Sequence, residues 1–417
     1  MSTVLIYTSP ARGHLYPMMD VAIALRDSGH RVVVQTLADE RDTVTSQGLE
    51  HRPVNPAVEA IPLDDHAGGN PLAQLRNTLA CWLARAPHEL DDLTAAEREV
   101  QPDLLVVDAN SWGAAAYAEG RKRPWAMFLP YCLPVPSADA PAFGPGSPAP
   151  RHWFDRARDR LVWAVQHATG RSTVKRLNVL RGEVGAAPVK TVSDLYQRSD
   201  VLLYRTAEPF EYPRRDWPAN VRAIGPGLWA PPGEEPEWLA DLPHPRTLVT
   251  VSTEFQDDGR IVRTALAALQ DQPGSVIVTT AALDPDDFAT SSERVHISRT
   301  LPHAVVIPEM DLVITHGGMG TVQRSLAAGV PLCVIPWGRD QKESARRVQQ
   351  AGAGTMLSRS QLTPERLQQA AATARTLEPG AQRVSEAFRQ AGGAAAAVEI
   401  LEDLVAANGQ SPLSPTG

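Results

Sequence analysis

The sequence has few cysteines and no cluster of positive charge. Only Cys81, Cys132 and Cys333 occur in 417 residues, and they stand far apart, which argues against a disulfide framework and a cysteine-based zinc site. The 40 Lys and Arg are outnumbered by 48 Asp and Glu, giving a net charge of −8. Without a basic face the chain is not expected to bind nucleic acid, and its cysteine usage fits a reducing, cytoplasmic compartment.

Long apolar runs are also lacking. No uninterrupted apolar stretch approaches the roughly 18 residues that a membrane-spanning helix needs, so no membrane partner is expected. The N-terminus, Met1 to Tyr7, has neither a basic flank nor an extended apolar core, and we expect no signal peptide. What remains is a globular composition, 43% apolar and 21% charged, whose length suits two or three domain-sized units.

Hydrophobic periodicity predicts β-α-β units in the first half of the chain. Short β-branched runs alternate with helical stretches, which is the pattern of a parallel sheet covered by helices. The predicted strands are 4–8, 31–36, 103–108 and 125–129, and the predicted helices are 17–27 and 112–121. Seven prolines in the segment 130–150 exclude a helix or a central strand, so this segment is expected to form a long ordered loop.

The same alternation resumes after a second proline-rich segment, which holds nine prolines. Predicted strands follow at 247–251, 275–280, 295–298, 312–315 and 331–335, with helices at 260–269, 321–328, 341–351 and within 364–406. The sequence thus predicts an α/β fold with two Rossmann-like, doubly wound parallel-sheet domains that face a cleft. The predicted boundaries are 1–207 for the first domain, 208–245 for the linker, 246–395 for the second domain, and 396–417 for a C-terminal helix and frayed tail. A ligand site is expected in the cleft.

The strongest motif is DLVITHGGMGT, residues 311–321, a strand that runs into a glycine-rich turn and then a helix. Glycines allow close backbone approach, and the first amides of the helix carry partial positive charge, so the turn predicts an anion site. His316 and Thr321 add side-chain donors beside Gly317, Gly318 and Gly320. The spacing matches neither a dehydrogenase fingerprint nor a P-loop. A tight turn whose glycines serve packing alone is the alternative.

In the first half, His14 lies where the first strand gives way to the first helix. An imidazole has a pKa near working pH, as a general base requires, but it needs a partner that fixes its tautomer. Asp108 ends a predicted strand on the same edge of the sheet and could supply that partner. The alternatives are a solvated or core histidine, and an aspartate that caps the following helix.

A second polar segment, PWGRDQ at 336–341, follows the strand 331–335 and precedes a helix, on the same rim as His316. Asp340 and Gln341 could hydrogen-bond vicinal hydroxyls, or they could serve only the start of that helix. The motif Asp284-Pro285-Asp286 has the Asp-x-Asp form of a metal site, but a solvated turn explains it better, and no H-E-x-x-H pair occurs. No metal and no cofactor are expected.

Taken together, the GHLYP start, the HGGMGT turn and the PWGRDQ segment resemble the GT-B glycosyltransferases that use nucleotide sugars. The nearest resemblance is to the bacterial branch that glycosylates macrolides, enediynes and other natural products. It spans nearly the whole chain, is most specific in residues 295–354, and is weak between residues 54 and 220, where the family reads its acceptors. It implies a hexosyltransferase of the EC 2.4 class with two small-molecule partners, a nucleotide sugar and a hydrophobic aglycone, and it leaves a homodimer open.

The resemblance also implies roles for individual residues. His14 would be the general base, oriented by Asp108, for an inverting, metal-independent transfer to an acceptor hydroxyl. The implied nucleotide-sugar residues are Ser252, Thr253, Arg299, Leu301, His316, Gly317, Gly318, Gly320 and Thr321, and the implied sugar-binding residues are Trp337, Asp340 and Gln341. Arg299-Thr300 stands where many relatives have an aspartate-tryptophan pair, which favours a TDP-deoxysugar over a UDP-sugar.

Two other functions remain open at this point. One is a GT-B sugar-nucleotide epimerase, which would need catalytic carboxylates in the cleft and would turn over donor without an acceptor. The other is a catalytically silent auxiliary protein that activates a partner transferase. Retention of His14 and Asp108 argues against the second, and a first turn that reads SPARGH leaves no place for the pyrophosphate of a hydride-transfer enzyme.

Overall fold

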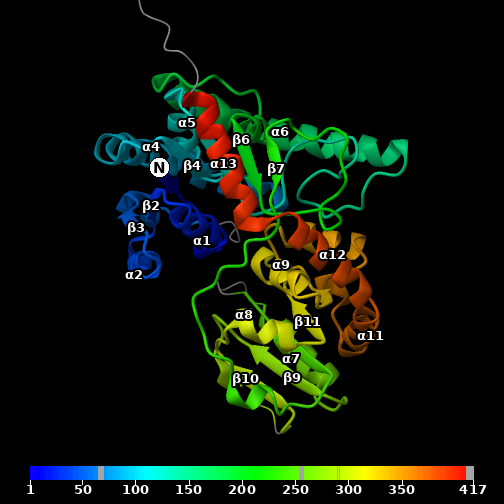
Figure 1. The fold of residues 1–417 in the computed structure, drawn as a ribbon. Helices are drawn as coiled ribbons and strands as arrows, with labels where there is room; N and C mark the ends of the chain where they lie inside the picture. The colour runs from blue at the N-terminus through cyan, green and yellow to red at the C-terminus, as the bar shows by residue number, and fades with distance from the viewer. Residues whose placement is uncertain (64–69, 253–257, 289, 291, 410–417) are drawn as a thin grey trace, which may run out of the picture.

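The computed structural model of the chain describes residues 1–63, 70–252, 258–288, 290 and 292–409. Its strands form two sheets, and every strand pairing in them is parallel. Figure 1 shows the sheets in two lobes, the first above and the second below. This confirms the predicted α/β fold of two parallel-sheet domains.

The first lobe contains a seven-stranded sheet. In spatial order its strands are β3 (Glu50–Pro53), β2 (Arg31–Thr36), β1 (Thr3–Tyr7), β4 (Leu104–Asp108), β5 (Trp125–Leu129), β6 (Val201–Tyr204) and β7 (Val221–Ala223). Its helices are α1 (Arg12–Asp27), α2 (Arg41–Thr45), α3 (Pro56–Ala60), α4 (Pro71–Val100), α5 (Trp112–Gly120) and α6 (Trp153–Glu183).

The second lobe contains a six-stranded sheet. In spatial order its strands are β10 (Val295–Ser298), β9 (Ser275–Thr279), β8 (Arg246–Thr250), β11 (Leu312–Thr315), β12 (Leu332–Val334) and β13 (Gly354–Met356). The helices that follow in the chain are α7 (Gly259–Leu269), α8 (His303–Val306), α9 (Met319–Ala327), α10 (Gln341–Gln350), α11 (Pro364–Arg375), α12 (Glu378–Gln390) and α13 (Gly393–Gly409).

Both faces of each sheet are covered, which is why the strands read as continuous apolar runs rather than alternating ones. Along β1, Val4 and Ile6 enter a core with α1 and α13, whereas Leu5 and Tyr7 enter a core with α4 and α5. The residue period of two in a strand sends successive side chains to opposite faces, so one short strand serves two cores. The second sheet is covered in the same way by two further clusters.

The last described helix leaves the second lobe and packs on the first. Ala397, Val398 and Leu401 of α13 lie in the same core as Leu15 and Met18 of α1. Figure 1 shows α13 (red) starting beside the end of α12 and running up along the upper lobe. Residues 410–417, the last part of the expected C-terminal helix and frayed tail at 396–417, lie outside the described residues.

The structure differs from the sequence expectation in two places that bear on the site. Helix α1 begins at Arg12 rather than at residue 17, because Pro17 is tolerated inside the helix. His14 is therefore helical rather than part of the preceding loop. The proline-rich segment 208–245 contains β7, which pairs with β6, so the first sheet continues into the stretch expected to be a linker. Among the described residues, no helix is both long and apolar enough to cross a membrane.

Candidate active site

The predicted pair His14 and Asp108 comes from neighbouring strand ends. β1 and β4 are adjacent in the first sheet, with Tyr7 opposite Val107. His14 follows β1 in the first turn of α1, and Asp108 is the last residue of β4. Because the carboxyl ends of parallel strands meet at one edge of a sheet, the two side chains come into contact.

The contact fixes the tautomer of the neutral imidazole. His14 Nδ1 lies 2.7 Å from Asp108 Oδ2. A carboxylate can only accept, so Nδ1 carries the proton and Nε2 of the neutral ring keeps its lone pair. Asp108 is fully buried, while the His14 side chain is 19% exposed. Asp108 does not cap the next helix, since α5 starts after Ser111.

Three polar residues that the sequence analysis missed extend this pair. The Asn110 side-chain amide Nδ2 lies 3.2 Å from His14 Nε2 and donates to its lone pair. The Tyr131 hydroxyl donates to Asn110 Oδ1 at 2.7 Å and lies 2.9 Å from the Tyr196 hydroxyl. The Asn110 backbone N–H also donates to Asp108 Oδ1 at 2.9 Å. The one signal in the sequence was an asparagine two residues after a strand-ending aspartate.

Two carboxylates control the basicity of His14. Burial by itself lowers the pKa of the imidazole, but Asp108 and Asp340 act in the opposite direction, and the net result is a pKa raised above the ordinary value of 6.5. Burial also raises the pKa of Tyr131 well above its ordinary value, so this hydroxyl stays protonated and can donate to Asn110.

The glycine-rich turn has the geometry of an anion site. β11 ends at Thr315, and α9 begins at Met319 with Gly318 in the N-cap position. Gly317 has φ +97°, and a Cβ there would lie 2.8 Å from Val334 Cγ1, so the turn needs glycine. Gly320 is exposed, and the backbone amides at the start of α9 have no intrahelical partner. The turn therefore presents donors and partial positive charge to the space above it.

His316 lies in this turn as a neutral side chain. Burial lowers its pKa to about 4, with Arg339 lowering it further and a hydrogen bond with the Thr250 backbone opposing the shift. At neutral pH the ring is therefore uncharged and carries one N–H, which the Thr250 backbone accepts. Thr321, in the first turn of α9, is partly exposed.

Asp340 and Gln341 lie at the start of α10, next to this turn. Gln341 is buried, and its Oε1 accepts the backbone N–H groups of Trp337 at 2.7 Å and Gly338 at 2.9 Å. That oxygen therefore shapes the turn. Asp340 occupies the N-cap position, but its side chain does not make the capping hydrogen bond. The Trp337 ring is covered by the Arg359 guanidinium, 4.0 Å from the ring centroid.

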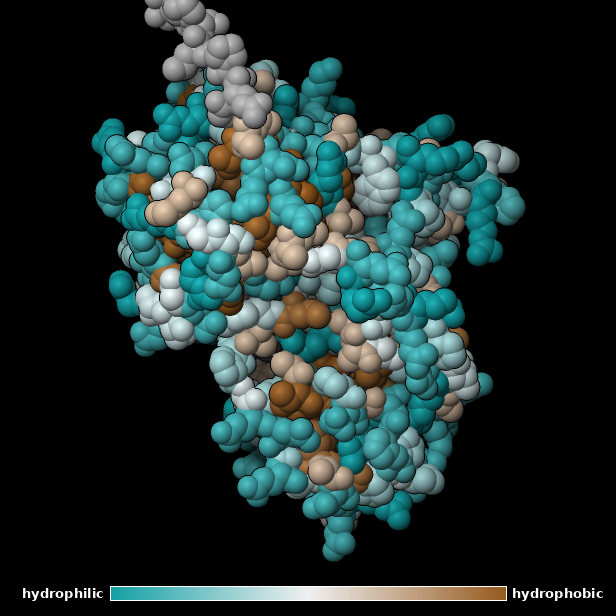
Figure 2. All heavy atoms as spheres, viewed as in Figure 1, coloured by the Kyte–Doolittle hydropathy of each residue, from teal (hydrophilic) through white to brown (hydrophobic). Residues whose placement is uncertain are grey.

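The two halves of the site face each other. Asp340 of the second lobe and His14 of the first interact electrostatically. The Asp340 carboxylate raises the pKa of His14, and the His14 imidazole lowers the pKa of Asp340. Burial nevertheless raises the pKa of Asp340. The space-filling view shows the surface hollowed between the lobes (Figure 2). The structure thus brings together the predicted base and the start of the predicted sugar-binding helix.

The remaining predicted residues lie on the second lobe. Ser252 is buried just after β8, and its backbone N–H donates to Asp258 Oδ2 at 2.8 Å. Thr253, also predicted to bind the nucleotide sugar, lies outside the described residues. Leu301 is partly buried and packs on the core of the second lobe.

Arg299 is tied to the loop that carries the Asp-x-Asp motif. Its guanidinium donates to the Leu283 carbonyl at 3.3 Å and lies 3.7 Å from Asp284 Oδ2. Asp284 Oδ1 accepts the backbone N–H of Asp286, which is a turn-forming contact. Within the described part of the chain, no three His, Cys, Asp or Glu side chains are grouped as a metal site would require.

Comparison with known proteins identifies the family. Residues 263–406 match the family model of the erythromycin biosynthesis protein CIII-like C-terminal domain. A crystal structure of the glycotransferase of kitacinnamycin superposes with a TM-score of 0.76 at 21% identity, covering 97% of this chain and 98% of that one. The demethyllactenocin mycarosyltransferase of Streptomyces fradiae is 25% identical, over 97% of this chain and 87% of the relative.

The deciding relative is 4′-demethylrebeccamycin synthase of Lentzea aerocolonigenes, which is 30% identical over 96% of this chain and 99% of its own length. The chain belongs to the GT-B glycosyltransferases of natural-product biosynthesis. This confirms the resemblance seen in the sequence. The glycosyltransferase takes a nucleoside-diphosphate sugar as donor and a natural-product aglycone as acceptor.

Proposed function

We propose that this glycosyltransferase moves a deoxysugar, with inversion, from a TDP-sugar to a hydroxyl of a small hydrophobic aglycone, without a metal ion. The observation that carries the proposal is the His14–Asp108 pair at 2.7 Å, which faces Asp340 across the gap between the lobes. A silent auxiliary protein has no use for a base-competent imidazole in this position.

In the proposed step, the acceptor hydroxyl gives its proton to His14 Nε2 as its oxygen forms a bond to C1 of the sugar. Asp108 stabilises the imidazolium that results, by accepting from Nδ1–H. In this structure the Asn110 amide donates to the lone pair of His14 Nε2, so the acceptor hydroxyl must displace the amide or share its position. Asn110 therefore marks where that hydroxyl binds.

On the opposite face of C1, the bond to the diphosphate breaks and its electron pair leaves with the phosphate oxygen. The amides of Gly318, Gly320 and Thr321 would stabilise that charge as it develops, and His316 would add a donor by turning its one N–H from Thr250 to the phosphate. Asp340 would hold sugar hydroxyls. The choice of TDP is supported by Arg299-Thr300, which stands where many relatives have an aspartate-tryptophan pair. Arg299 itself contacts Leu283 and Asp284.

The purified enzyme, incubated with TDP- and UDP-sugars and a panel of hydrophobic aglycones, is expected to form a glycoside in the presence of EDTA. Mass spectrometry of the product and NMR of its anomeric centre check transfer and inversion. Inhibition by EDTA that Mg²⁺ reverses would contradict the metal-independent mechanism. Consumption of donor with no acceptor and no glycoside would instead favour the epimerase.

Replacing Asp108 by asparagine is expected to move the acid limb of the kcat/KM profile to lower pH. His14 must be unprotonated to act as a base, so activity falls as pH drops through its pKa. Removing the Asp108 charge removes a cause that raises this pKa and leaves burial, which lowers it. The pH-independent value of kcat/KM should also fall, by about 10²-fold or more, because the imidazolium loses the carboxylate that stabilises it.

A matched control is Asp103→Asn. Asp103 lies just before β4, at the opposite end of the strand from Asp108, and accepts the Thr3 backbone N–H at 2.7 Å. This variant should keep the acid limb where it is in the wild-type enzyme. If the limb stays in place in Asp108→Asn as well, Asp108 does not control the base.

A further inference from the structure

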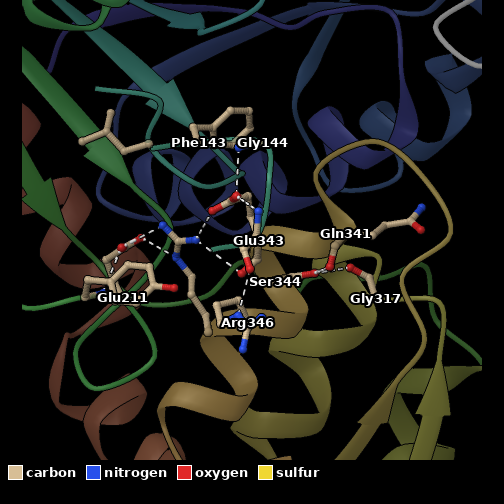
Figure 3. Close-up of polar contacts among 12 residues, drawn as sticks. Phe143, Gly144, Glu211, Gly317, Gln341, Glu343, Ser344 and Arg346 are labelled. Atoms are coloured by element: carbon tan, nitrogen blue, oxygen red, sulfur yellow. Dashed lines mark hydrogen bonds and ion pairs between the residues drawn. The ribbon is translucent and has the colours of Figure 1, made fainter. Parts of the chain in front are cut away.

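One turn of α10 contacts both the glycine-rich turn of the second lobe and a loop of the first lobe. Glu343 Oε1 accepts the backbone N–H groups of Gly144 at 2.8 Å and Gly146 at 2.9 Å. Arg346 Nε donates to the Gly146 carbonyl at 2.8 Å. Figure 3 shows these contacts, with the loop above and α10 below. Two helical side chains thus seat the 130–150 loop of the first lobe on the second lobe.

The seat is buried and charged. Glu343 and Arg347 are 1% and 2% exposed, and Arg347 Nη1 lies 3.0 Å from Glu343 Oε2. Arg347 also forms an ion pair with Glu211 at 2.9 Å, and Glu211 lies 3.5 Å from Arg214. Two carboxylates and two guanidinium groups balance one another, which is the condition for holding charges in so dry a place. Glu343 is fixed in position by this network.

The same turn of α10 also contacts the glycine-rich turn at residues 316–321, which we call the donor cradle. Ser344 Oγ donates to the carbonyl of Gly317 at 2.5 Å, and that glycine belongs to the turn proposed to bind the diphosphate. Gln341, three residues before Ser344, shapes the turn that begins at Trp337. Glu343 and Ser344 are therefore consecutive residues that hold the acceptor-side loop and the donor cradle, respectively (Figure 3).

At its other end the 130–150 loop reaches the base. Tyr131, the second residue of the loop, donates to Asn110, which contacts His14 Nε2. The ring centroids of Tyr131 and His14 lie 6.0 Å apart. The loop therefore spans from the proposed base to the helix that bears Asp340. Any shift of the loop on α10 changes both the acceptor pocket and its distance from the sugar.

We propose that Glu343 is a positioning residue for glycosyl transfer, which seats the 130–150 loop on α10 so that occupation of the donor cradle stabilises the acceptor pocket. The inference rests on the proposed function, since it takes the Gly317 turn as the diphosphate site. Donor binding would tighten the Gly317 turn, Ser344 would transmit this to α10, and Glu343 would hold Gly144 and Gly146 more firmly. The acceptor would then meet a preformed pocket only when the donor is in place.

Hydrogen–deuterium exchange with TDP as the probe tests this. In the wild-type enzyme, TDP is expected to slow amide exchange both in a peptide covering 311–321 and in one covering 140–147. In Glu343→Ala, TDP should still slow the first peptide, while the loop peptide exchanges about tenfold faster than wild type with or without TDP. If Glu343 had a purely structural role, amide exchange in the loop peptide would be faster in Glu343→Ala but would still slow when TDP binds.

Gly146→Ala is a second variant that leaves the charged network intact. Gly146 has φ +66°, and a Cβ there would lie 2.7 Å from Lys342 Cβ and 2.8 Å from the Lys342 carbonyl, so alanine should lift the loop from α10. Gly185→Ala is the matched control, because Gly185 has φ +75° and open space around its Cβ position. The control should keep the response of both peptides to TDP.

The outcomes separate this inference from the proposed function. If calorimetry shows that TDP binds and the 311–321 peptide slows, but the wild-type loop peptide does not respond, the proposed role of Glu343 is wrong while the donor site stands. The same conclusion follows if Gly146→Ala keeps the wild-type response. If TDP neither binds nor slows the 311–321 peptide, the proposed TDP donor site fails, and the inference fails with it.

Discussion

Replacing His14 by alanine is expected to lower kcat by about 10³-fold, the usual contribution of a well-placed general base. The Asp108 contact at Nδ1 leaves the lone pair of the His14 imidazole on Nε2, where the acceptor hydroxyl is proposed to bind, and water cannot reproduce that orientation. Binding of TDP should be unchanged, because the glycine turn lies on the other lobe. Initial rates with the best donor and acceptor pair, together with calorimetry of TDP, check both statements.

His30→Ala is the matched control for this experiment. His30 is also paired with a carboxylate, Glu402 Oε1 at 2.9 Å, but it precedes β2 and so lies at the opposite edge of the sheet from His14. Its loss should change kcat less than twofold, a negligible fraction of the His14 effect. Comparable losses in the two variants would mean that the His14 effect is structural rather than catalytic.

Replacing Arg347 by methionine is expected to destabilise the enzyme by about 3–5 kcal/mol, because it leaves Glu343 without its cation in a dry interior. Burial raises the pKa of Glu211, yet Arg347 and Arg214 outweigh burial and bring it down to about 2. That dependence shows how strongly the network needs its guanidinium groups. Differential scanning fluorimetry should show an unfolding midpoint lower by roughly 10 °C.

Two further variants calibrate this result. Arg389 forms an exposed ion pair with Glu386 at 2.6 Å, and Arg389→Met should leave the unfolding midpoint nearly unchanged. The double variant Glu343→Gln/Arg347→Met should be more stable than Arg347→Met, because the unpaired carboxylate is gone. If the double variant is less stable than the single, unpaired charge is not the cause of the loss.

The sequence predicted those features that depend on local pattern. β2, β5, β10 and β11 have the predicted bounds, because strands buried on both faces appear as uninterrupted apolar runs. His14 and Asp108 could be paired before any coordinates, because both follow strand ends, and parallel strands place those ends on one edge. The glycine-rich turn was visible for the same reason.

What the sequence could not show depends on side chains that meet across long separations. Asn110 reaches Tyr131 and Tyr196, and Glu343 reaches Gly144, 199 residues away. No spacing rule relates such positions. The 30-residue helix α4 and the 31-residue α6 were also missed, because their polar and apolar residues blur the helical stripe and each helix is partly covered by the other rather than by a sheet.

Because α13 returns to the first lobe, dividing the chain at the boundary between the lobes does not yield two self-contained fragments. A fragment ending after β7 would expose the apolar groove beside α1 that Ala397, Val398 and Leu401 fill. A fragment starting at β8 would in turn expose the apolar face of α13, which packs on the first lobe in the whole chain. Exchange of the second lobe between relatives would therefore have to keep α13 with the first lobe whose groove it fills, so the chain would be joined at two junctions instead of one.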